Sequence, residues 1–477
     1  MLTLVREHRG FFLGFTLAGL ALRLLFVLYF PAITDDSHIY ADLATNWVQH
    51  GIYGQTQGGQ PAKPILPSDA RLPGYPAFLA LVFRIFGVGN FRAVMLAQVL
   101  IDLGTCFIVA DLSRRMVSER AARVAFVLAA LCPFLANYAA AVLTETLEVF
   151  FTALALDCAV IGLNGLYEVS LTGRRAQVSG QKASANPGHI LFFWAASGAA
   201  IGACILLRPD GGILLAVLLL YLAVKGTGDL GRRIIVCGSV ALFALAPLVP
   251  WTLRNFHTLH HFQPLVPRYA NDTDELVPNG FNRWVLTWMA DYASVEEIYW
   301  NVPGDRIDAA KLPARAFDNA EERSATLQVI SDYNQSKDIT PAVDALFGRL
   351  AAERIHAHPA RFYVILPILR VADMWLRPRT EILPPDPRWW EFNDDRQHSV
   401  AAVGLGALNI LYIGAALWAL AWRRFGIRYA GLLVGFLLLR SAFLGTLENP
   451  EPRYTLEGYP AVIVLASALA RPKVARS

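Results

Sequence analysis

Charged residues are scarce in this chain. Asp, Glu, Lys and Arg make up 17% of its 477 residues, and 55% are hydrophobic, whereas ordinary soluble domains carry about 25% charged residues. The length would suit two or three soluble domains, but repeated apolar runs of roughly 20 residues instead indicate a polytopic helical membrane protein. The formal net charge of +4 is too small to suggest a nucleic-acid partner.

Cysteine and the common catalytic motifs are also scarce. The five cysteines all lie inside apolar segments, where a thiol behaves as a small hydrophobic side chain. No CxxC pair is present, so we expect neither a disulfide framework nor a cysteine metal site. The sequence contains no Walker loop, HExxH or GxSxG motif, so nucleotide-dependent and hydrolase chemistry lack support.

Ten apolar segments are predicted to span the membrane. The first follows Arg6 and Arg9, as the apolar part of a signal peptide would. It is longer than a typical signal peptide core and no small-x-small cleavage site follows, so we expect an uncleaved helix. The predicted spans are 11–30, 92–112, 121–140, 142–163, 189–207, 211–225, 233–250, 400–421, 428–447 and 456–470.

The positions of Lys and Arg predict the topology. Two shorter apolar stretches, 74–87 and 361–376, carry charges in their middles. If neither crosses the membrane, every basic cluster faces the cytoplasm, as the positive-inside rule requires. We therefore expect both to lie at the outer interface. The extracytoplasmic segments are then 31–91, 251–399 and the turn at 447–455.

This topology divides the chain into three predicted regions. They are an N-terminal membrane module, 1–250, with a functional outer loop at 31–91; an extracytoplasmic cap, 251–399; and C-terminal membrane helices, 400–477. Within the cap, 317–332 and 340–358 have the pattern of amphipathic helices. No part of the cap has the pattern of a soluble domain with a core of its own.

Three carboxylates are candidate catalytic residues on the outer side. Asp35 and Asp36 directly follow the first span, where a carboxylate can act as a general base. The alternative is an Asx turn or an N-cap for a helix from about 37 to 47. Glu145 lies at the outer end of the span 142–163; it could join Asp35 around a cation or an acceptor group, or could be an exposed acid that favours the helix dipole.

Four arginines form a complementary set on the same side: Arg71, Arg208, Arg254 and Arg453. A guanidinium at this boundary can bind a lipid phosphate through two hydrogen bonds. Each arginine alone could instead extend to phospholipid headgroups. Together with the acidic pair, the set predicts transfer of a group from a lipid phosphate, because a phosphate leaving group needs cationic stabilisation and an attacking hydroxyl needs a base.

The order of these motifs resembles the GT-C membrane glycosyltransferases. The resemblance is to the branch of protein O-mannosyltransferases and bacterial lipid A aminoarabinose transferases, and covers the membrane part nearly end to end. The motifs are Asp35-Asp36, the stretch from Tyr40 to Tyr53, Arg71 to Pro76, Thr144-Glu145, Arg208-Pro209, Pro250 to Asn255 and Arg453-Tyr454. Many relatives have Glu where this chain has Asp36, and the region 256–360 does not align with the extra domains of either group.

The resemblance implies an enzyme of the inner or plasma membrane that moves a sugar from a polyprenyl-phosphate donor, with its active site on the extracytoplasmic face. It implies an inverting displacement in which Asp35 is the base and Asp36 and Glu145 support it or bind a cation. Arg453 would be the foremost donor-phosphate ligand, with Arg254 and Arg71. The acceptor, whether protein, lipid or glycan, stays open.

A divalent metal ion is therefore a candidate cofactor, although no metal requirement follows from the sequence. The acidic run from Asp272 to Glu275 could also bind such an ion. Runs of this kind are more often simply solvated.

Two other classes of function remain as alternatives. A transporter or flippase of lipid-linked sugars would need polar groups at the bilayer midplane and an internal repeat. Only Asp102 and Asp157 are candidates for the first, and no two-fold repeat is visible. A structural subunit of an envelope complex would leave the acidic pair and the four arginines unexplained.

Overall fold

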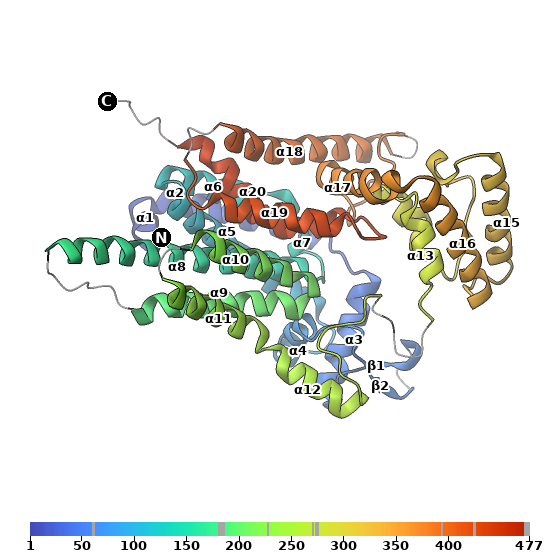
Figure 1. Ribbon diagram of the computed structural model, residues 1–477, viewed down its shortest axis with the longest axis horizontal. Coiled ribbons are helices and arrows are strands. Elements are labelled where there is room, and N and C mark those ends of the chain that lie inside the picture. The colour runs from blue at the N-terminus through green and yellow to red at the C-terminus, as the bar shows by residue number, and fades with distance from the viewer. Residues whose placement is uncertain are drawn as a thin grey trace. The chain divides into compact units, whose positions relative to one another are not determined.

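The structure is a computed structural model that describes residues 1–59, 63–179, 187–226, 229–269, 271, 276–392, 395–422 and 426–471. The chain forms two compact units (Figure 1). The first unit comprises Met1–Asp272, Tyr412–Leu437 and Leu456–Ser477, and the second comprises Thr273–Leu411 and Leu438–Thr455. The division into a membrane module at 1–250, a cap at 251–399 and C-terminal membrane helices at 400–477 stays a prediction.

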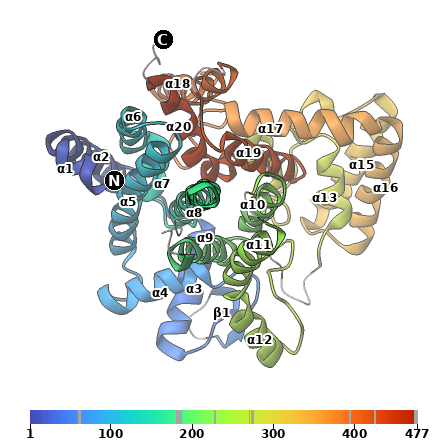
Figure 2. The same ribbon diagram turned by 60° about the vertical axis from the view of Figure 1, so that its left-hand side comes forward.

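The first unit is a helical bundle. In it, α8 packs against α5 and α9, and α9 packs against α11 (Figure 2). Its helices are α1 (Leu2–Glu7), α2 (Arg9–Tyr29), α3 (Asp35–His50), α4 (Gly74–Phe86), α5 (Phe91–Met116), α6 (Glu119–Ala130), α7 (Pro133–Ala139), α8 (Glu145–Ser179), α9 (Pro187–Leu207), α10 (Gly212–Lys225), α11 (Leu230–Leu245), α12 (Leu248–Leu259) and α20 (Tyr459–Ser467), with parts of α18 (Arg396–Ala421) and α19 (Ala430–Leu444).

Five described helices are long and apolar enough to cross a membrane, namely α2, α5, α8, α9 and α18. The number rises to seven if two bent pairs each count as one span: α6 with α7, which meet at 50°, and α11 with α12, which meet at 41°. Pro133 begins α7 and explains the first break, because proline cannot continue the hydrogen bonding of α6. The chain is thus a multi-pass membrane protein.

The arrangement of ten spans stays a prediction. Each predicted span coincides with a helix, but α10, α19 and α20 have only 14, 15 and 9 residues. At 1.5 Å per residue, a straight helix needs about 20 residues to cross the hydrocarbon core.

Among the described residues, the predicted all-α class holds apart from one small hairpin. Strands β1 (Gly54–Thr56) and β2 (Ile65–Pro67) pair antiparallel, with Gln55 opposite Leu66. Residues of α3 fix the hairpin, because Asp42 accepts a 2.7 Å hydrogen bond from the Thr56 amide. The hairpin is thereby tied to α3 within the segment 31–91.

The two carboxylates named above as candidates for a midplane position are both ion-paired inside the first unit. Asp102 on α5 accepts a 2.7 Å hydrogen bond from the Arg23 guanidinium of α2, and Arg23 is fully buried. Asp157 lies 3.4 Å from Arg115. Their pairing within the bundle gives both carboxylates a role in holding helices together.

The second unit has a hydrophobic core of its own, so the expectation of a coreless cap is wrong. Trp284, Trp288 and Phe347 are fully buried at its centre. Its helices are α13 (Asn279–Leu286), α14 (Tyr292–Ser294), α15 (Ala320–Ser336), α16 (Pro341–Ala357) and α17 (Leu366–Leu376), with the remaining parts of α18 and α19. The two predicted amphipathic helices are confirmed as α15 and α16, with Thr340 capping α16 and Pro341 in its first turn.

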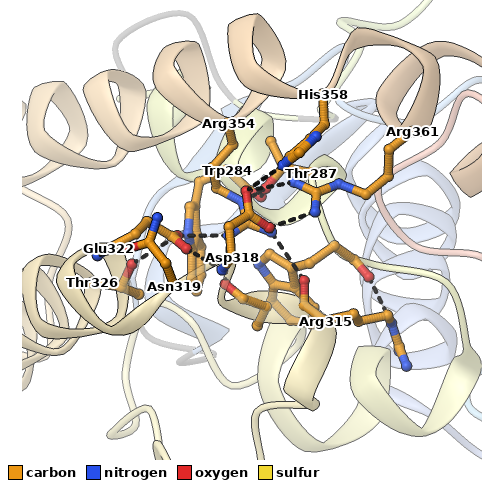
Figure 3. Close-up of polar contacts among 12 residues, drawn as sticks. Trp284, Thr287, Arg315, Asp318, Asn319, Glu322, Thr326, Arg354, His358 and Arg361 are labelled. Atoms are coloured by element: carbon orange, nitrogen blue, oxygen red, sulfur yellow. Dashed lines mark hydrogen bonds and ion pairs between the residues drawn. The ribbon is translucent and has the colours of Figure 1, made fainter.

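A polar network supports this core (Figure 3). The Arg354 guanidinium is 1% exposed and lies 2.6 Å from Glu322. It also donates a 2.9 Å hydrogen bond to the Thr287 hydroxyl and a 2.8 Å bond to the Ala316 carbonyl. A buried charge is tolerated when it is paired and hydrogen-bonded in this way.

Candidate active site

The acidic pair lies in the first turn of α3. Thr34 is the N-cap residue, and the Ser37 hydroxyl accepts a 2.9 Å hydrogen bond from the Thr34 amide. The cap predicted for the aspartates is therefore formed by Thr34 and Ser37. Asp35 and Asp36 are instead the first two helical residues, where a negative charge interacts favourably with the helix dipole.

The two aspartates have different environments. The Asp35 side chain is exposed to solvent. Asp36 is half-buried, and its carboxylate lies 3.1 Å from the Arg71 guanidinium. Of the two predicted carboxylates, Asp36 is thus the one that the fold brings to a predicted arginine.

A set of hydrogen bonds fixes the backbone that carries Arg71. The Tyr53 hydroxyl donates a 2.9 Å bond to the Arg71 carbonyl. Arg254 donates a 2.9 Å bond to the Ser68 carbonyl and another bond to the Tyr53 carbonyl. The Arg254 guanidinium also lies 5.4 Å from the centre of the Trp251 ring. Arg254 therefore holds the loop that positions Arg71.

Four of the predicted residues lie close enough to Tyr40 for their charges to affect its pKa. Burial raises the pKa of Tyr40 well above the usual value of a phenol, and the carboxylates of Asp36 and Glu145 add to this increase, while Arg71 and Arg208 oppose it. The phenol is therefore protonated at neutral pH and can donate a hydrogen bond.

No separate role is predicted for Tyr40 from the sequence. A signal was present in its spacing, because residues four apart on a helix share a face and Tyr40 follows Asp36 by four positions. Its ring also packs edge-on against Tyr75, with 5.1 Å between the ring centres.

Arg208 is held by carboxylates that sequence reasoning missed. It lies 3.2 Å from Asp210 and 3.7 Å from Glu148, which is 2% exposed. Glu457 lies within hydrogen-bonding reach of Glu148. Glu145 is also buried, at 3% exposure, so its interpretation as an exposed helix-start acid is wrong.

An apolar cavity of the first unit lies beside the loop between α3 and α4 that carries Arg71. Its volume is about 590 Å³, and Trp47, Tyr53, Trp251 and Arg254 are among the residues that line it. Small-molecule sites typically measure about 300–1,000 Å³ and are mostly apolar with a few polar groups. A hydrocarbon chain with an anionic head would suit these walls.

Arg453 belongs to the second unit. It lies 2.6 Å from Glu451 and 5.3 Å from the centre of the Tyr454 ring. Two buried arginines hold its backbone: Arg440 donates bonds of 3.0 and 2.9 Å to the Tyr454 carbonyl, and Arg379 donates a 2.8 Å bond to the Pro452 carbonyl. The predicted convergence of Arg453 with Asp35 and Arg254 stays a prediction.

The described part of the chain contains no group of three or more His, Cys, Asp or Glu side chains arranged to hold a metal ion. The acidic run 272–275 lies outside the described residues.

Comparison with known proteins supports the resemblance to glycosyltransferases that the sequence motifs carry. Residues 66–164, which include Arg71 and Glu145, match the family model described as dolichyl-phosphate-mannose-protein mannosyltransferase. The match confirms the resemblance to GT-C glycosyltransferases that the motifs indicate. No curated protein sequence matches the chain.

Several solved structures are similar to this chain, and one of them reaches a TM-score of 0.50. The oligosaccharyltransferase of Archaeoglobus fulgidus, tethered to an acceptor peptide, is similar with a TM-score of 0.50 and 13% identity over 96% of this chain and 49% of that one. AglB from Archaeoglobus fulgidus, with an inhibitory peptide and a dolichol-phosphate, has a TM-score of 0.49 and 14% identity over 97% of this chain and 50% of that one. ArnT from Cupriavidus metallidurans, bound to undecaprenyl phosphate, has a TM-score of 0.40 and 15% identity over 97% of this chain and 78% of that one. This chain spans about half the length of the oligosaccharyltransferases that it matches.

Proposed function

We propose that this chain is a membrane glycosyltransferase that moves a sugar from a polyprenyl-phosphate donor to an acceptor on the extracytoplasmic face. The observation that carries the proposal is the pair formed by Asp36 and Arg71, 3.1 Å apart, in the neighbourhood of Tyr40. A base, a cation and a neutral hydrogen-bond donor are the groups that such a transfer needs.

The donor occupies the apolar cavity in this proposal. Its polyprenyl chain contacts Trp47 and Trp251, and its phosphate lies toward Arg254 and Arg71. Arg254 has bonds to two loop carbonyls, so it contributes its charge and also keeps Arg71 in place. Arg208 completes the phosphate ligands proposed within the first unit, and the role of Arg453 as a phosphate ligand stays a prediction from the sequence. The family match at 66–164 supports a donor of this kind.

The proposed reaction is an inverting displacement at the anomeric carbon. A carboxylate removes the proton of the acceptor hydroxyl, whose oxygen forms the new bond to the sugar. The bond between the sugar and the phosphate oxygen breaks, and the polyprenyl phosphate leaves with its charge balanced by guanidinium groups. We propose Asp36 as the base because the fold places it beside Arg71, one of the proposed phosphate ligands, and Asp35 is the alternative. Glu145 shapes the field around Tyr40 or binds a cation.

The membrane arrangement is part of the proposal. Ten helices span the membrane, α4 and α17 lie at the outer interface, and the acidic pair faces the extracytoplasmic side. Single cysteines test this arrangement: a cysteine at position 35 should react with an impermeant reagent added outside, and a cysteine near Arg114 only with the reagent added inside.

The decisive experiment compares two substitutions in the reconstituted chain with a defined polyprenyl-phosphate-sugar donor. Asp36→Asn should reduce transfer by about 10²–10⁴-fold, the usual contribution of a general base, while Asp35→Asn keeps most of the activity. Both variants should insert and melt like the parent chain.

Loss of transfer in Asp35→Asn alone would assign the base to Asp35. Parental transfer by both variants would overturn the proposed mechanism.

A further inference from the structure

A second cavity is formed by residues of the second unit alone. Its volume is about 420 Å³, within the usual range for small-molecule sites. Its walls include Glu297, Lys311, the loop from Pro384 to Phe392, and Ser399 in the first turn of α18. None of the residues assigned to the proposed active site lines it.

The charged groups around Arg388 are held in place by one another. Arg388 binds Glu297 through two hydrogen bonds of 2.7 Å each and lies 3.4 Å from Glu391. Asp386 accepts a 2.6 Å bond from the Arg388 amide. Hydrogen-bonding groups fixed before a ligand arrives favour binding, because less conformational entropy is lost on association.

The cavity offers donors and acceptors together. The carboxylates of Glu297, Asp386, Glu391 and Asp395 are acceptors, whereas the Lys311 ammonium and the Ser399 hydroxyl can donate. Since both cations and carboxylates line the wall, an anion would meet the carboxylates and a simple cation would meet Lys311 and Arg388. A neutral ligand rich in hydroxyl groups suits this lining, since each hydroxyl both donates and accepts.

An exposed aromatic ring completes the cavity. The Phe392 side chain is 47% exposed although it lines the wall. Its backbone φ is 55°, in the left-handed region that a bulky residue rarely adopts. Such conformations persist where the surroundings impose them and are concentrated at functional sites. A ring presented in this way can pack against the C–H face of a sugar.

We propose that this cavity binds a neutral saccharide, with a sugar ring stacked on Phe392 and its hydroxyls bound by the surrounding carboxylates, Lys311 and Ser399. The inference goes beyond the proposed function, because the cavity would hold a saccharide whether or not the chain transfers one. Nothing in it depends on Asp36 or on the donor.

The test is calorimetric titration of the purified full chain in a detergent without a sugar headgroup. The probes are maltotriose, α-mannobiose and N-acetylchitotriose. At least one should bind, and Phe392→Ala should weaken its binding by about tenfold, since an aromatic contact contributes up to about 1.5 kcal/mol. Phe392→Trp should retain binding because it keeps an aromatic face.

Phe262→Ala is the matched control, because it removes an equally apolar ring, 73% exposed, from the first unit. It should bind like the parent chain, as should Asp36→Asn, which separates this inference from the proposed function. Three results would overturn the inference: no probe binds; Phe392→Ala and the parent chain bind equally; or spermidine binds at this site in place of the saccharides.

Discussion

Gly280 is the position at which the second unit is most sensitive to a single methyl group. It lies in α13 against α16. A Cβ atom at position 280 would lie 2.8 Å from the carbonyl carbon of Asp344, closer still to its oxygen, and 2.9 Å from the amide nitrogen of Gly348. These are backbone atoms, so no side chain can rotate away. Gly280→Ala must therefore push α13 and α16 apart.

The separation would affect two kinds of interaction. The Asp344 carboxylate accepts bonds of 3.0 and 2.9 Å from the amides of Gly280 and Phe281 at the start of α13. The Phe281 and Phe347 rings, 5.3 Å apart, pack across the same pair of helices. Overpacking alone costs about 1–3 kcal/mol, and a weakened hydrogen bond to a charged group adds about 1 kcal/mol. We expect a loss of about 3 kcal/mol in the stability of the second unit.

Gly348→Ala is the matched control. A Cβ at this position on α16 would lie 3.5 Å from the Gly280 Cα, an ordinary contact. Alanine is also favoured over glycine in a helix by up to about 1 kcal/mol, so this variant should be neutral or slightly stabilised.

Pulse proteolysis of the full chain in urea, with fragments identified by mass, measures both variants. If Gly280→Ala resisted proteolysis as well as Gly348→Ala does, the two helices would not be in the close contact described here.

Three further outcomes are expected. Arg354→Met should lower the stability of the second unit by about 3–5 kcal/mol in the same proteolysis assay, because it leaves buried partners of the guanidinium unpaired. Burial raises the pKa of Asp318, but the hydrogen bond from Arg361 and the nearby arginine charges outweigh it and hold that pKa below its usual value. The unfolded chain therefore binds this proton more tightly than the folded chain does. The stability that Asp318 contributes is present above its unfolded pKa and is lost as the pH falls through its folded pKa. Asp318→Asn should reduce this loss of stability at acidic pH in melting curves recorded between neutral and acidic pH. In the first unit, Asp102→Asn leaves the Arg23 charge buried without its counter-ion and should lower the melting temperature in detergent, with unchanged melting contradicting the buried pair.

Much of the fold could be predicted because helix formation in a membrane protein depends on local sequence. A helix lies at each predicted span, since an uninterrupted apolar run fixes both helicity and burial. The stretches 74–87 and 361–376 are helical too, as α4 and α17 with a π-helical turn before α17. The charged residues in the middle of each stretch set these two segments apart from the predicted spans, and they can be read from the sequence without any knowledge of tertiary contacts.

The site could be predicted only to the level of its segments. Asp35 and Asp36 are adjacent in sequence, and adjacent helical residues point about 100° apart. Which of them meets Arg71 depends on how a loop more than 30 residues away packs against α3. The sequence therefore identified the acidic pair, and only the tertiary structure brought Asp36 to Arg71.

The other features of the protein divide in the same way between those that local sequence determines and those that tertiary contacts determine. Composition and the order of motifs determined that this is a multi-pass membrane protein with acids and arginines at the ends of its helices. Only tertiary contacts decided that Arg254 would hold a loop through its carbonyls, that Glu145 would be buried and that residues 281–351 would form a core. Hydrophobic runs act within one segment, whereas an ion pair, a cavity or a core requires atoms from segments far apart in the chain.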